Sequence, residues 1–436
     1  MKRTIISLAA VLLFCSNLSA RQRLALSQAE CRERALAHSE ELQQADNAIR
    51  QAGLDRKIAS SAYLPNVAGS ATGTYVLPDI DMMGTELRMR GVYMAGISLT
   101  QPIYTGGKIS SGQRLAKIGE AVASEQRRMT RMEVIAEADN AYWSYIAVER
   151  KVRMTEQYKT LMDTLFRQTE AAQRVGMATD NDLLRIDARR SEIEYQLQRA
   201  RNGADLCRMS LCRIIGVESD TEFIPTDTLV SISAPVHLDD NIDSRPELHL
   251  LEKQIEANEQ QIRMTRADML PTIGFSAGYT YYGNIKLKGT ADIGNGTQIP
   301  YTQQFRDGIG LAMIAVKIPI FHWNEGRNKV RKARYDLDNA RLELQKNSRL
   351  LDLEVQQAIR NVEDGYRMIE AADIAFRQAE ENLRVMRNRY AASMAPLTDL
   401  LDAQSQWQQA SSNLIEAQTQ YKIYETEYLR ATGKLE

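Results

Sequence analysis

The sequence predicts a mainly α-helical chain that also contributes strands to a membrane β-barrel, and three observations support this prediction. Two long stretches, Lys108–Gly176 and Gly326–Ala392, lack proline and repeat apolar residues at helical spacing. Each would form one helix of roughly 65 residues, about 100 Å at 1.5 Å per residue. Four shorter segments alternate apolar and polar residues with the period of a strand. The same order of helices and strands occurs twice along the chain, which indicates an internal duplication.

Helices of this length exclude an ordinary compact domain, where a helix averages about 11–12 residues. They must pack along other long helices, as in coiled coils and helical tubes. The returning stretch 182–215 carries the matching heptad pattern, in which apolar residues such as Ile186, Ile193 and Leu197 recur at spacings of three and four. Arg190 is the one charged residue in that seam. A period of seven predicts supercoiling against neighbouring helices.

The amino terminus predicts a secretory signal peptide over residues 1–20. Basic Lys2 and Arg3 precede an apolar run, Ile5–Phe14, and small residues follow as far as Ala20. The run is too short to span a bilayer as a helix. Cys15 would also suit a lipoprotein signal, but the bulky residues just before it favour cleavage near Ala20.

Composition argues against several classes of function. The net charge of −1 gives no attraction for nucleic acid. The four cysteines and four histidines have neither metal-ligand spacing nor the pattern of a disulfide framework. No serine or cysteine has a histidine at a recognisable catalytic spacing. We therefore expect no enzyme activity, no cofactor, no metal and, after signal cleavage, no membrane-spanning helix.

The chain divides into two repeats after the signal peptide. The first, 21–243, contains a helix, a strand hairpin over 66–101, a long helix over 108–176, a returning helix over 182–215 and a linker over 216–243. The second, 244–436, contains a helix, a strand hairpin over 272–318, a long helix over 326–392 and a returning helix over 397–432.

Fixed offsets support the duplication. The pairs Pro102 with Pro319, Asp182 with Asp399, and Gly216 with Gly433 are each 217 positions apart. Before the strand hairpins the offset is smaller, because Pro65 and Pro271 are 206 positions apart. The second copy therefore carries 11 additional residues between its strands. We expect them in an exposed loop over 283–307, since loops tolerate insertions.

The strands predict a barrel shared between chains. A strand of about ten residues crosses a bilayer when tilted, but only a closed barrel satisfies strand backbone in lipid. Four strands are too few, because the smallest such barrels have about eight. Four tyrosines towards the far ends of the strands would form the aromatic girdle of the barrel: Tyr75, Tyr93, Tyr279 and Tyr281. A small soluble sheet packed on helices would show the same apolar faces, and it remains the alternative.

Several short motifs, in this order and in duplicate, resemble the TolC-like outer-membrane efflux protein family, the outer membrane factors of tripartite pumps. They are Tyr63-Leu64-Pro65-Asn66-Val67, Gln101-Pro102-Ile103-Tyr104-Thr105-Gly106-Gly107, Val175-Gly176-Met177-Ala178-Thr179, Arg245-Pro246-Glu247-Leu248, Leu270-Pro271, Pro319-Ile320-Phe321 with Gly326-Arg327, Arg389-Tyr390 and Asp399-Leu400-Leu401-Asp402-Ala403-Gln404. The likeness covers nearly all of the mature chain.

The resemblance implies a homotrimer in the outer membrane of a Gram-negative bacterium, with a long periplasmic portion. Three chains would share a 12-stranded barrel and a helical coiled-coil tunnel, the exit duct of a tripartite efflux or type I secretion-like system. The implied partners are a periplasmic adaptor (membrane fusion) protein, an inner-membrane transporter of the RND or ABC class, and outer-membrane lipid. The alternative from a different class is a soluble periplasmic coiled-coil scaffold or adaptor.

The resemblance also assigns roles to the tips of the helical hairpins, which in this family meet the adaptor. The matching residues here are Val175, Gly176, Met177, Ala178, Thr179, Ser393, Met394, Ala395 and Pro396. Helix capping alone would explain Gly176. Ser393 is a departure, because the family usually has glycine there.

Some relatives carry acidic residues one to two turns before the second tip, around the pore entrance. Arg384 and Arg387 match those positions here. They are three residues apart and share a helix face. We expect a positively charged pore entrance, with a solvated outer helix face as the alternative.

Overall fold

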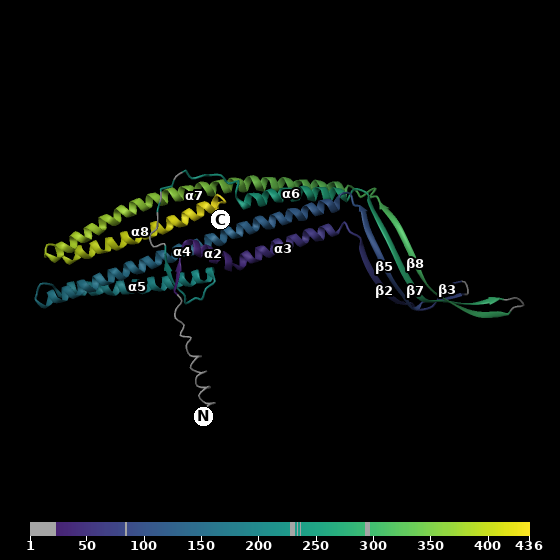
Figure 1. The fold of residues 1–436 in the computed structure, drawn as a ribbon, viewed down its shortest axis with the longest axis horizontal. Coiled ribbons are helices and arrows are strands. Elements are labelled where there is room, and N and C mark those ends of the chain that lie inside the picture. Colours follow the sequence, from purple (N-terminus) through teal and green to yellow (C-terminus); the bar gives the residue numbers. More distant parts are fainter. Residues whose placement is uncertain (1–22, 83–84, 227–231, 233, 236, 293–296) are drawn as a thin grey trace, which may run out of the picture. The chain divides into compact units, whose positions relative to one another are not determined.

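The computed structural model describes residues 23–436 except 83–84, 227–231, 233, 236 and 293–296 (Figure 1). The predicted signal peptide and Cys15 lie outside the described residues. The helices are α2 (Gln28–His38), α3 (Glu40–Ser61), α4 (Lys108–Arg174), α5 (Asp180–Ile215), α6 (Pro246–Ala267), α7 (Glu325–Ala391) and α8 (Leu397–Ala431). The strands are β1 (Arg23–Leu26), β2 (Asn66–Tyr75), β3 (Ile80–Met82), β4 (Thr85–Arg88), β5 (Arg90–Tyr104), β6 (Glu222–Pro225), β7 (Thr272–Asp292) and β8 (Gln298–Lys317).

The two long helices expected from the sequence are α4 and α7, and each is continuous over 67 residues. The returning helices α5 and α8 have 36 and 35 residues. Two local features were not expected. Ser39 adopts extended backbone and separates α2 from α3, where the sequence suggested one helix. Strands β1 and β6 form a small parallel pair from Arg23 opposite Glu222 to Leu26 opposite Pro225.

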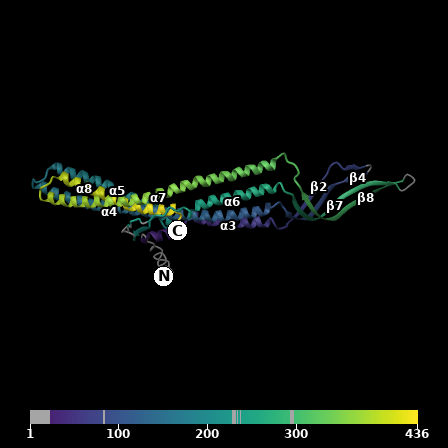
Figure 2. The same ribbon diagram turned by 90° about the horizontal axis from the view of Figure 1, so that it is seen from above.

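The chain forms two compact units. The first comprises the described parts of 1–47, 125–250 and 345–436, and the second comprises 48–124 and 251–344. In the first unit, α5 lies beside the carboxyl-terminal part of α4, and α8 lies beside that of α7 (Figures 1 and 2). The second unit holds most of α3 and α6, together with β2, β3, β4, β5, β7 and β8.

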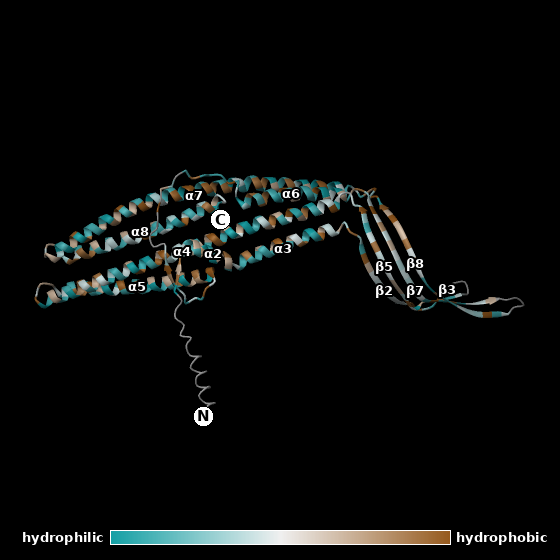
Figure 3. Cartoon of the chain, in the orientation of Figure 1, coloured by the Kyte–Doolittle hydropathy of each residue, from teal (hydrophilic) through white to brown (hydrophobic). Residues whose placement is uncertain are grey.

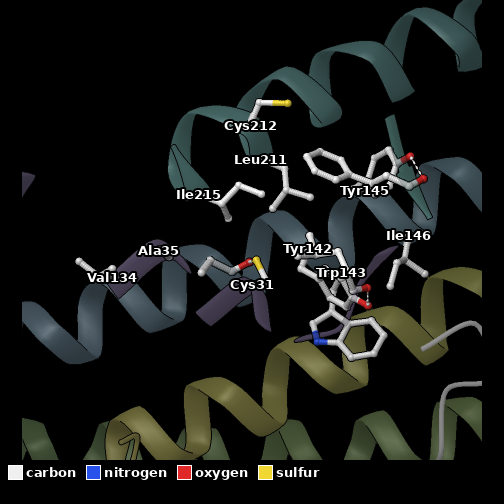
Figure 4. Packing of buried hydrophobic residues seen from close by; sticks show 13 residues of the cluster. Cys31, Ala35, Val134, Tyr142, Trp143, Tyr145, Ile146, Leu211, Cys212 and Ile215 are labelled. Atoms are coloured by element: carbon white, nitrogen blue, oxygen red, sulfur yellow. Dashed lines mark hydrogen bonds between the residues drawn. The ribbon is translucent and has the colours of Figure 1, made fainter. Parts of the chain in front are cut away.

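The core of the first unit joins α2, α4, α5 and β6 around Tyr142 and Trp143, whose rings meet edge to face at 5.3 Å (Figure 4). Cys31 and Cys212 are buried there with free thiols. Burial raises the pKa of Cys31 to about 12, so its thiol stays protonated at neutral pH.

A buried carboxylate links three helices beside this core. Asp139 of α4 is 0% exposed, and it accepts two hydrogen bonds from Arg32 of α2 at 2.8 and 2.5 Å. The hydroxyl of Thr426 in α8 donates a third at 2.7 Å. A buried charge requires such pairing and hydrogen bonding. The arrangement fixes α2 and α8 at one level of α4.

The heptad seam of α5 is buried as its sequence pattern indicates. Ile186, Ile193 and Leu197 are each at most 1% exposed. The exception, Arg190, forms an ion pair with Asp163 at 2.8 Å and places its guanidinium 4.4 Å from the centre of the Phe166 ring. These contacts provide partners for a charge at the seam of a supercoiled pair.

The second unit contains an antiparallel sheet in the order β2-β5-β7-β8 (Figure 1). Strand β4 pairs with the later part of β7, and β3 pairs with β4. Within the described residues, β2 pairs only with β5, and β8 pairs only with β7. The sheet therefore has two open edges.

The prediction of a loop over 283–307 is wrong for most of that range. Strand β7 continues to Asp292, and β8 begins at Gln298. The pairing shifts between Tyr282 and Ile285, because β7 passes through a bulge there. Asn284 there has a φ of 66°. A bulge moves the apolar and polar alternation by one residue, so the period-two pattern was interrupted although the strand was not.

Candidate functional site: a strand wall and two helix tips

The register of the four strands places apolar residues on one face of the sheet. Antiparallel partners point to the same face, and one such row joins Val67, Leu99 and Ala277. The next rows join Ile97 with Tyr279 and Ala95 with Tyr281. We call this surface the apolar face. Most of its large side chains are exposed in the single chain, and Leu99 is half-buried.

Three of the four predicted girdle tyrosines lie on the apolar face near the bulge. Tyr279 and Tyr281 follow one another along β7, and the ring of Tyr93 on β5 lies 6.3 Å from that of Tyr281. Tyr75 lies opposite Arg90, just beyond a second bulge in the β2–β5 pair. All four are exposed, between 40% and 65%. Exposed aromatic rings at one level of a sheet are typical of a membrane interface.

The opposite face of β2, β5 and β7 is polar. Its side chains include hydroxyls and amides from the same paired rows: Asn66, Ser70, Thr72, Thr74, Ser98, Thr100, Ser276 and Thr280. Strand β8 departs from this pattern, because Ile309, Leu311 and Met313 lie on the polar side. Figure 3 shows the hydrophobic colouring along β8. The sheet thus has one apolar face and one mainly polar face.

The first helix tip, between α4 and α5, closes with a left-handed glycine. Gly176 has a φ of 77°. The N–H of Gly176 donates to the carbonyl of Gln173 at 2.9 Å, and the N–H of Met177 donates to that of Ala172 at 2.8 Å. This is the Schellman pattern of helix ends. Val175 and Met177 are 70% and 76% exposed.

The second tip repeats this geometry with a different residue. Ser393, 217 positions after Gly176, has a φ of 57°. Its N–H donates to the carbonyl of Tyr390 at 2.9 Å, and the N–H of Met394 donates to that of Arg389 at 2.7 Å. Met394 is 67% exposed, close to its equivalent Met177. A serine therefore holds the backbone conformation that usually selects glycine.

The tips differ in how the next helix begins. Thr179 caps α5 by accepting from the N–H of Asp182 at 3.2 Å, and the Asp182 carboxylate accepts from the hydroxyl and N–H of Thr179. The hydroxyl and then the N–H of Thr179 lower the pKa of Asp182. Pro396, the equivalent position, gives α8 no side-chain cap. Asp399, the equivalent of Asp182, is left exposed without that cap.

The two predicted pore-entrance arginines have different surroundings. Arg384 forms a double hydrogen bond with Glu381, at 2.8 and 2.5 Å, on the helix surface. Hydrogen bonds from Arg384 lower the pKa of Glu381. In the described part of the chain no ion pair to Arg387 is found. Local pairing reduces the net positive charge that Arg384 brings to this end of α7.

Sequence reasoning missed two features of the tip region. Tyr390 and Thr169 share a hydrogen bond of 3.3 Å between their hydroxyls, which links α7 to α4. Asp399 and Asp402 are exposed, three residues apart, in the first turns of α8. Their spacing places both carboxylates on one face. The acidic pair was visible in the sequence, but it follows the second tip instead of preceding it.

Other kinds of site are not seen within the described residues. No group of three or more histidine, cysteine, aspartate or glutamate side chains could hold a metal ion there. No described helix has the length and hydropathy needed to cross a bilayer.

Comparison with known families gives one match along most of the chain. The family described as "Outer membrane efflux protein" matches residues 31–217 and 238–434. Among curated relatives, the outer membrane efflux protein BepC of Brucella suis is 23% identical over 394 residues, covering 87% of this chain and 79% of BepC. The outer membrane protein TolC of Escherichia coli is 24% identical over 392 residues, covering 86% and 76%.

Solved structures share the fold. A membrane protein from Pseudomonas aeruginosa superposes with a TM-score of 0.76 at 20% identity, covering 93% of each chain. The outer membrane protein VceC from Vibrio cholerae gives 0.75 at 17% identity, covering 93% of this chain and 96% of VceC.

Exchanging the residues at the two left-handed positions should have opposite effects. Ser393→Gly removes the cost of left-handed backbone for a residue with a side chain, about 1 kcal/mol, and Gly176→Ser introduces it. Amide hydrogen exchange in the adjoining last helical turn should become about fivefold slower for Ser393→Gly and about fivefold faster for Gly176→Ser. Equal changes of the same sign at both tips would contradict this assignment.

Proposed function

The chain belongs to the outer membrane efflux protein family and is an outer-membrane channel for efflux, and from this premise we propose that three copies form one continuous duct. The four strands of each copy would build one third of a 12-stranded barrel, and the long helices would build a tunnel across the periplasm. The duct conducts its cargo passively, since the family comprises channels and not enzymes.

One observation supports the shared barrel above the others: the sheet has an apolar face and two open edges. Unpaired strand backbone cannot remain in lipid, because each unsatisfied polar group costs several kcal/mol. Pairing β8 of one copy with β2 of the next would satisfy both edges. The apolar face, with Tyr93, Tyr279 and Tyr281 near its outer end and Tyr75 just beyond the bulge, would then meet lipid, and the polar face would line the channel.

We further propose that the chain arose by duplication, with repeats over 21–243 and 244–436 after a signal peptide. Equivalent interactions 217 positions apart support this. Arg213 pairs with Glu137 at 2.5 Å, and Arg430 pairs with Glu354 at 3.3 Å. The glycines that end α5 and α8, Gly216 and Gly433, have φ values of 67° and 72°. The family also matches the chain in two segments.

The tips suit a role as the docking surface for a periplasmic adaptor. Met177 and Met394 occupy equivalent positions and expose most of their side chains. Methionine is flexible and polarisable, and it is frequent on surfaces that bind partner helices. Val175, Gly176, Ala178, Thr179, Ser393, Ala395 and Pro396 complete the two tips. An inner-membrane transporter of the RND or ABC class would supply cargo and energy through that adaptor.

The pore entrance is proposed at the same end of the helices, with Arg384 and Arg387 near its mouth. Arg384 pairs with Glu381, whereas no ion pair to Arg387 or to the nearby Arg389 is found within the described residues. Asp399 and Asp402 contribute opposing charge from α8. Charge around a narrow mouth selects ions through the field it focuses.

A soluble periplasmic scaffold, the alternative reading, does not fit these findings. It leaves a sheet with exposed apolar rows and open edges in water, a combination that promotes aggregation. Family membership also favours the channel.

The oligomer is tested directly by native mass spectrometry of the protein extracted in detergent. We expect an oligomer, because closing a barrel from four-stranded contributions requires more than one chain, and the resemblance to the family implies that the number is three. Carbonate washing should leave the protein in the outer-membrane fraction. A chain that is only monomeric, or that carbonate releases, would contradict the shared barrel.

Charged substitutions at the tips should separate docking from folding. Met177→Glu or Met394→Glu should lower adaptor cross-linking and export by about tenfold, the loss expected for an exposed anchor in an interface. The trimer and its thermal stability should remain unchanged. Met269→Glu makes the same change at an exposed methionine just before β7, and it should affect neither readout. Normal docking in both tip variants would refute the assignment.

The pore-entrance assignment predicts a change in ion selectivity. Arg384→Glu combined with Arg387→Glu should move the reversal potential in planar bilayers towards cation selectivity. Arg331→Glu with Arg334→Glu is the matched control, because it makes the same charge change at the same spacing, on exposed residues near the start of α7. Equal shifts in the two variants would mean that Arg384 and Arg387 do not line the pore.

A further inference from the structure

Beyond the bulge, β7 and β8 continue as part of a second, smaller sheet whose polarity is inverted. We call this the outer sheet and define it as β3, β4 and residues 285–292 of β7 with 298–305 of β8. We call the part of the sheet before the bulge, formed by β2, β5, β7 and β8, the wall. Strand β8 runs from the wall into the outer sheet without an extra residue, because the extra residue lies in β7. The two faces can therefore be followed continuously along β8.

The face of β8 that continues the polar side of the wall becomes apolar in the outer sheet. Along β8, the alternate residues of this face are Phe305, Gln303, Tyr301 and Ile299. Their partners on β7 are Ile285, Leu287, Gly289 and Ala291. Strand β4 adds Leu87 opposite Leu287, and β3 adds Ile80 opposite Leu87. Each of these four neighbouring rows thus contains at least one large apolar side chain.

The opposite face, which continues the apolar, lipid-type side of the wall, becomes charged and polar. Lys286 lies between Arg88 and Gln304, and Lys288 lies between Glu86 and Thr302. Arg88 is held by Asp79 at 2.9 Å and by Glu86 at 3.4 Å. This face is suited to water and lipid headgroups, and charged groups there are costly in contact with acyl chains.

The bulge that produces the inversion is held in place by side-chain contacts. Asn284 has left-handed backbone, and its amide donates to the carbonyls of Arg90 and Gly91 at 2.9 and 3.0 Å. Gly91, the extra residue of the β2–β5 pair, also has positive φ, at 71°. Both strand pairs therefore change register at the same level. The ring of Tyr301 packs over Gly289, its cross-strand partner.

Large apolar residues of the inverted face are exposed in the single chain. Ile80 and Ile299 are 40% and 47% exposed, and Tyr301 and Phe305 are 39% and 37% exposed. Within the described residues, no helix packs extensively against these strands. An apolar surface of this kind requires a partner.

We propose that the apolar faces of three outer sheets pack against one another above the barrel and form an apolar constriction at its outer exit. This rests on the proposed trimer. The occupant of each face is a second copy of the same face. Strands β7 and β8 run unbroken from wall to outer sheet, so three copies stand around one exit. Because the apolar face continues the channel side of the wall, all three copies turn it towards the same axis.

A constriction of this kind would act on what passes the exit. Narrow apolar rings hinder water and ions by dewetting, and they yield to larger cargo because no directional bonds hold them. The charged face would remain on the outside, towards headgroups and solvent. The change of polarity at Asn284 thus gives β7 and β8 two apolar surfaces on opposite faces. One would contact lipid within the membrane, and the other would contact the neighbouring copies outside the membrane.

Cysteine cross-linking on whole cells tests the contact. Tyr301→Cys is on the apolar face, and its neighbour Thr302→Cys is the matched control on the opposite face. A short, membrane-impermeant bis-maleimide added outside should give covalent dimers with Tyr301→Cys and none with Thr302→Cys. The unsubstituted chain, treated in parallel, reports any reaction of Cys31, Cys207 or Cys212. Ile299→Cys provides a second apolar position should Tyr301→Cys fail to assemble.

The outcomes separate this proposal from the trimer on which it rests. The constriction is overturned, and the proposed channel is left intact, if native mass spectrometry shows trimers but Tyr301→Cys and Ile299→Cys give no cross-linked dimer. The same conclusion follows if Thr302→Cys gives as much cross-linked dimer as they do. Monomers overturn both. In planar bilayers, Tyr301→Ser with Phe305→Ser should raise single-channel conductance at least about twofold, since a polar ring no longer dewets. Unchanged conductance also overturns the constriction.

Discussion

The open edges of a four-stranded sheet are the constraint on which the rest of this molecule depends. Each edge presents a row of backbone donors and acceptors that neither lipid nor an apolar neighbour can satisfy. Within the described chain, nothing pairs with the outer side of β2 or β8. A protein with this sheet must either aggregate or assemble, and assembly with copies of itself satisfies every edge at once. The long helices follow from the same logic, because 67-residue helices also need neighbours along their length.

The two halves of the chain form equivalent helix ends and helix starts at the tips with different residues. Gly176 and Ser393 hold the same left-handed position, the serine at a cost in backbone strain. Thr179 caps α5 and hydrogen-bonds to Asp182. Pro396, at the equivalent position, gives α8 no side-chain cap, so Asp399 lacks the hydrogen bonds that hold Asp182. The halves are therefore alike in backbone and unlike in surface chemistry at the tips. As the docking surfaces that we propose, two tips of similar backbone and different chemistry would suit an asymmetric partner better than two identical ones.

Sequence reasoning succeeded where periodicity is long and regular. The spans of α4 and α7, the seam of α5 and the first rows of all four strands agree with patterns visible in the sequence. It failed where a single residue changes the period. The bulge at Asn284 shifts the alternation by one, and a continuous strand was interpreted as a loop. The pairing of Arg384 with Glu381 depends on rotamers, which spacing suggests but does not decide.

The sequence by itself determined the elements and the repeated order from which we infer a duplication, because helix and strand periods and fixed offsets can be read along the chain. It also indicated that four strands are too few to close a barrel alone, so a membrane barrel would need partner chains. Only the tertiary structure decided which residues share a face. The register between strands placed Tyr93 beside Tyr281 and turned Phe305 and Tyr301 to the side opposite Lys286. Register depends on cross-strand hydrogen bonds and bulges, which join residues distant in sequence, so no local pattern contains it.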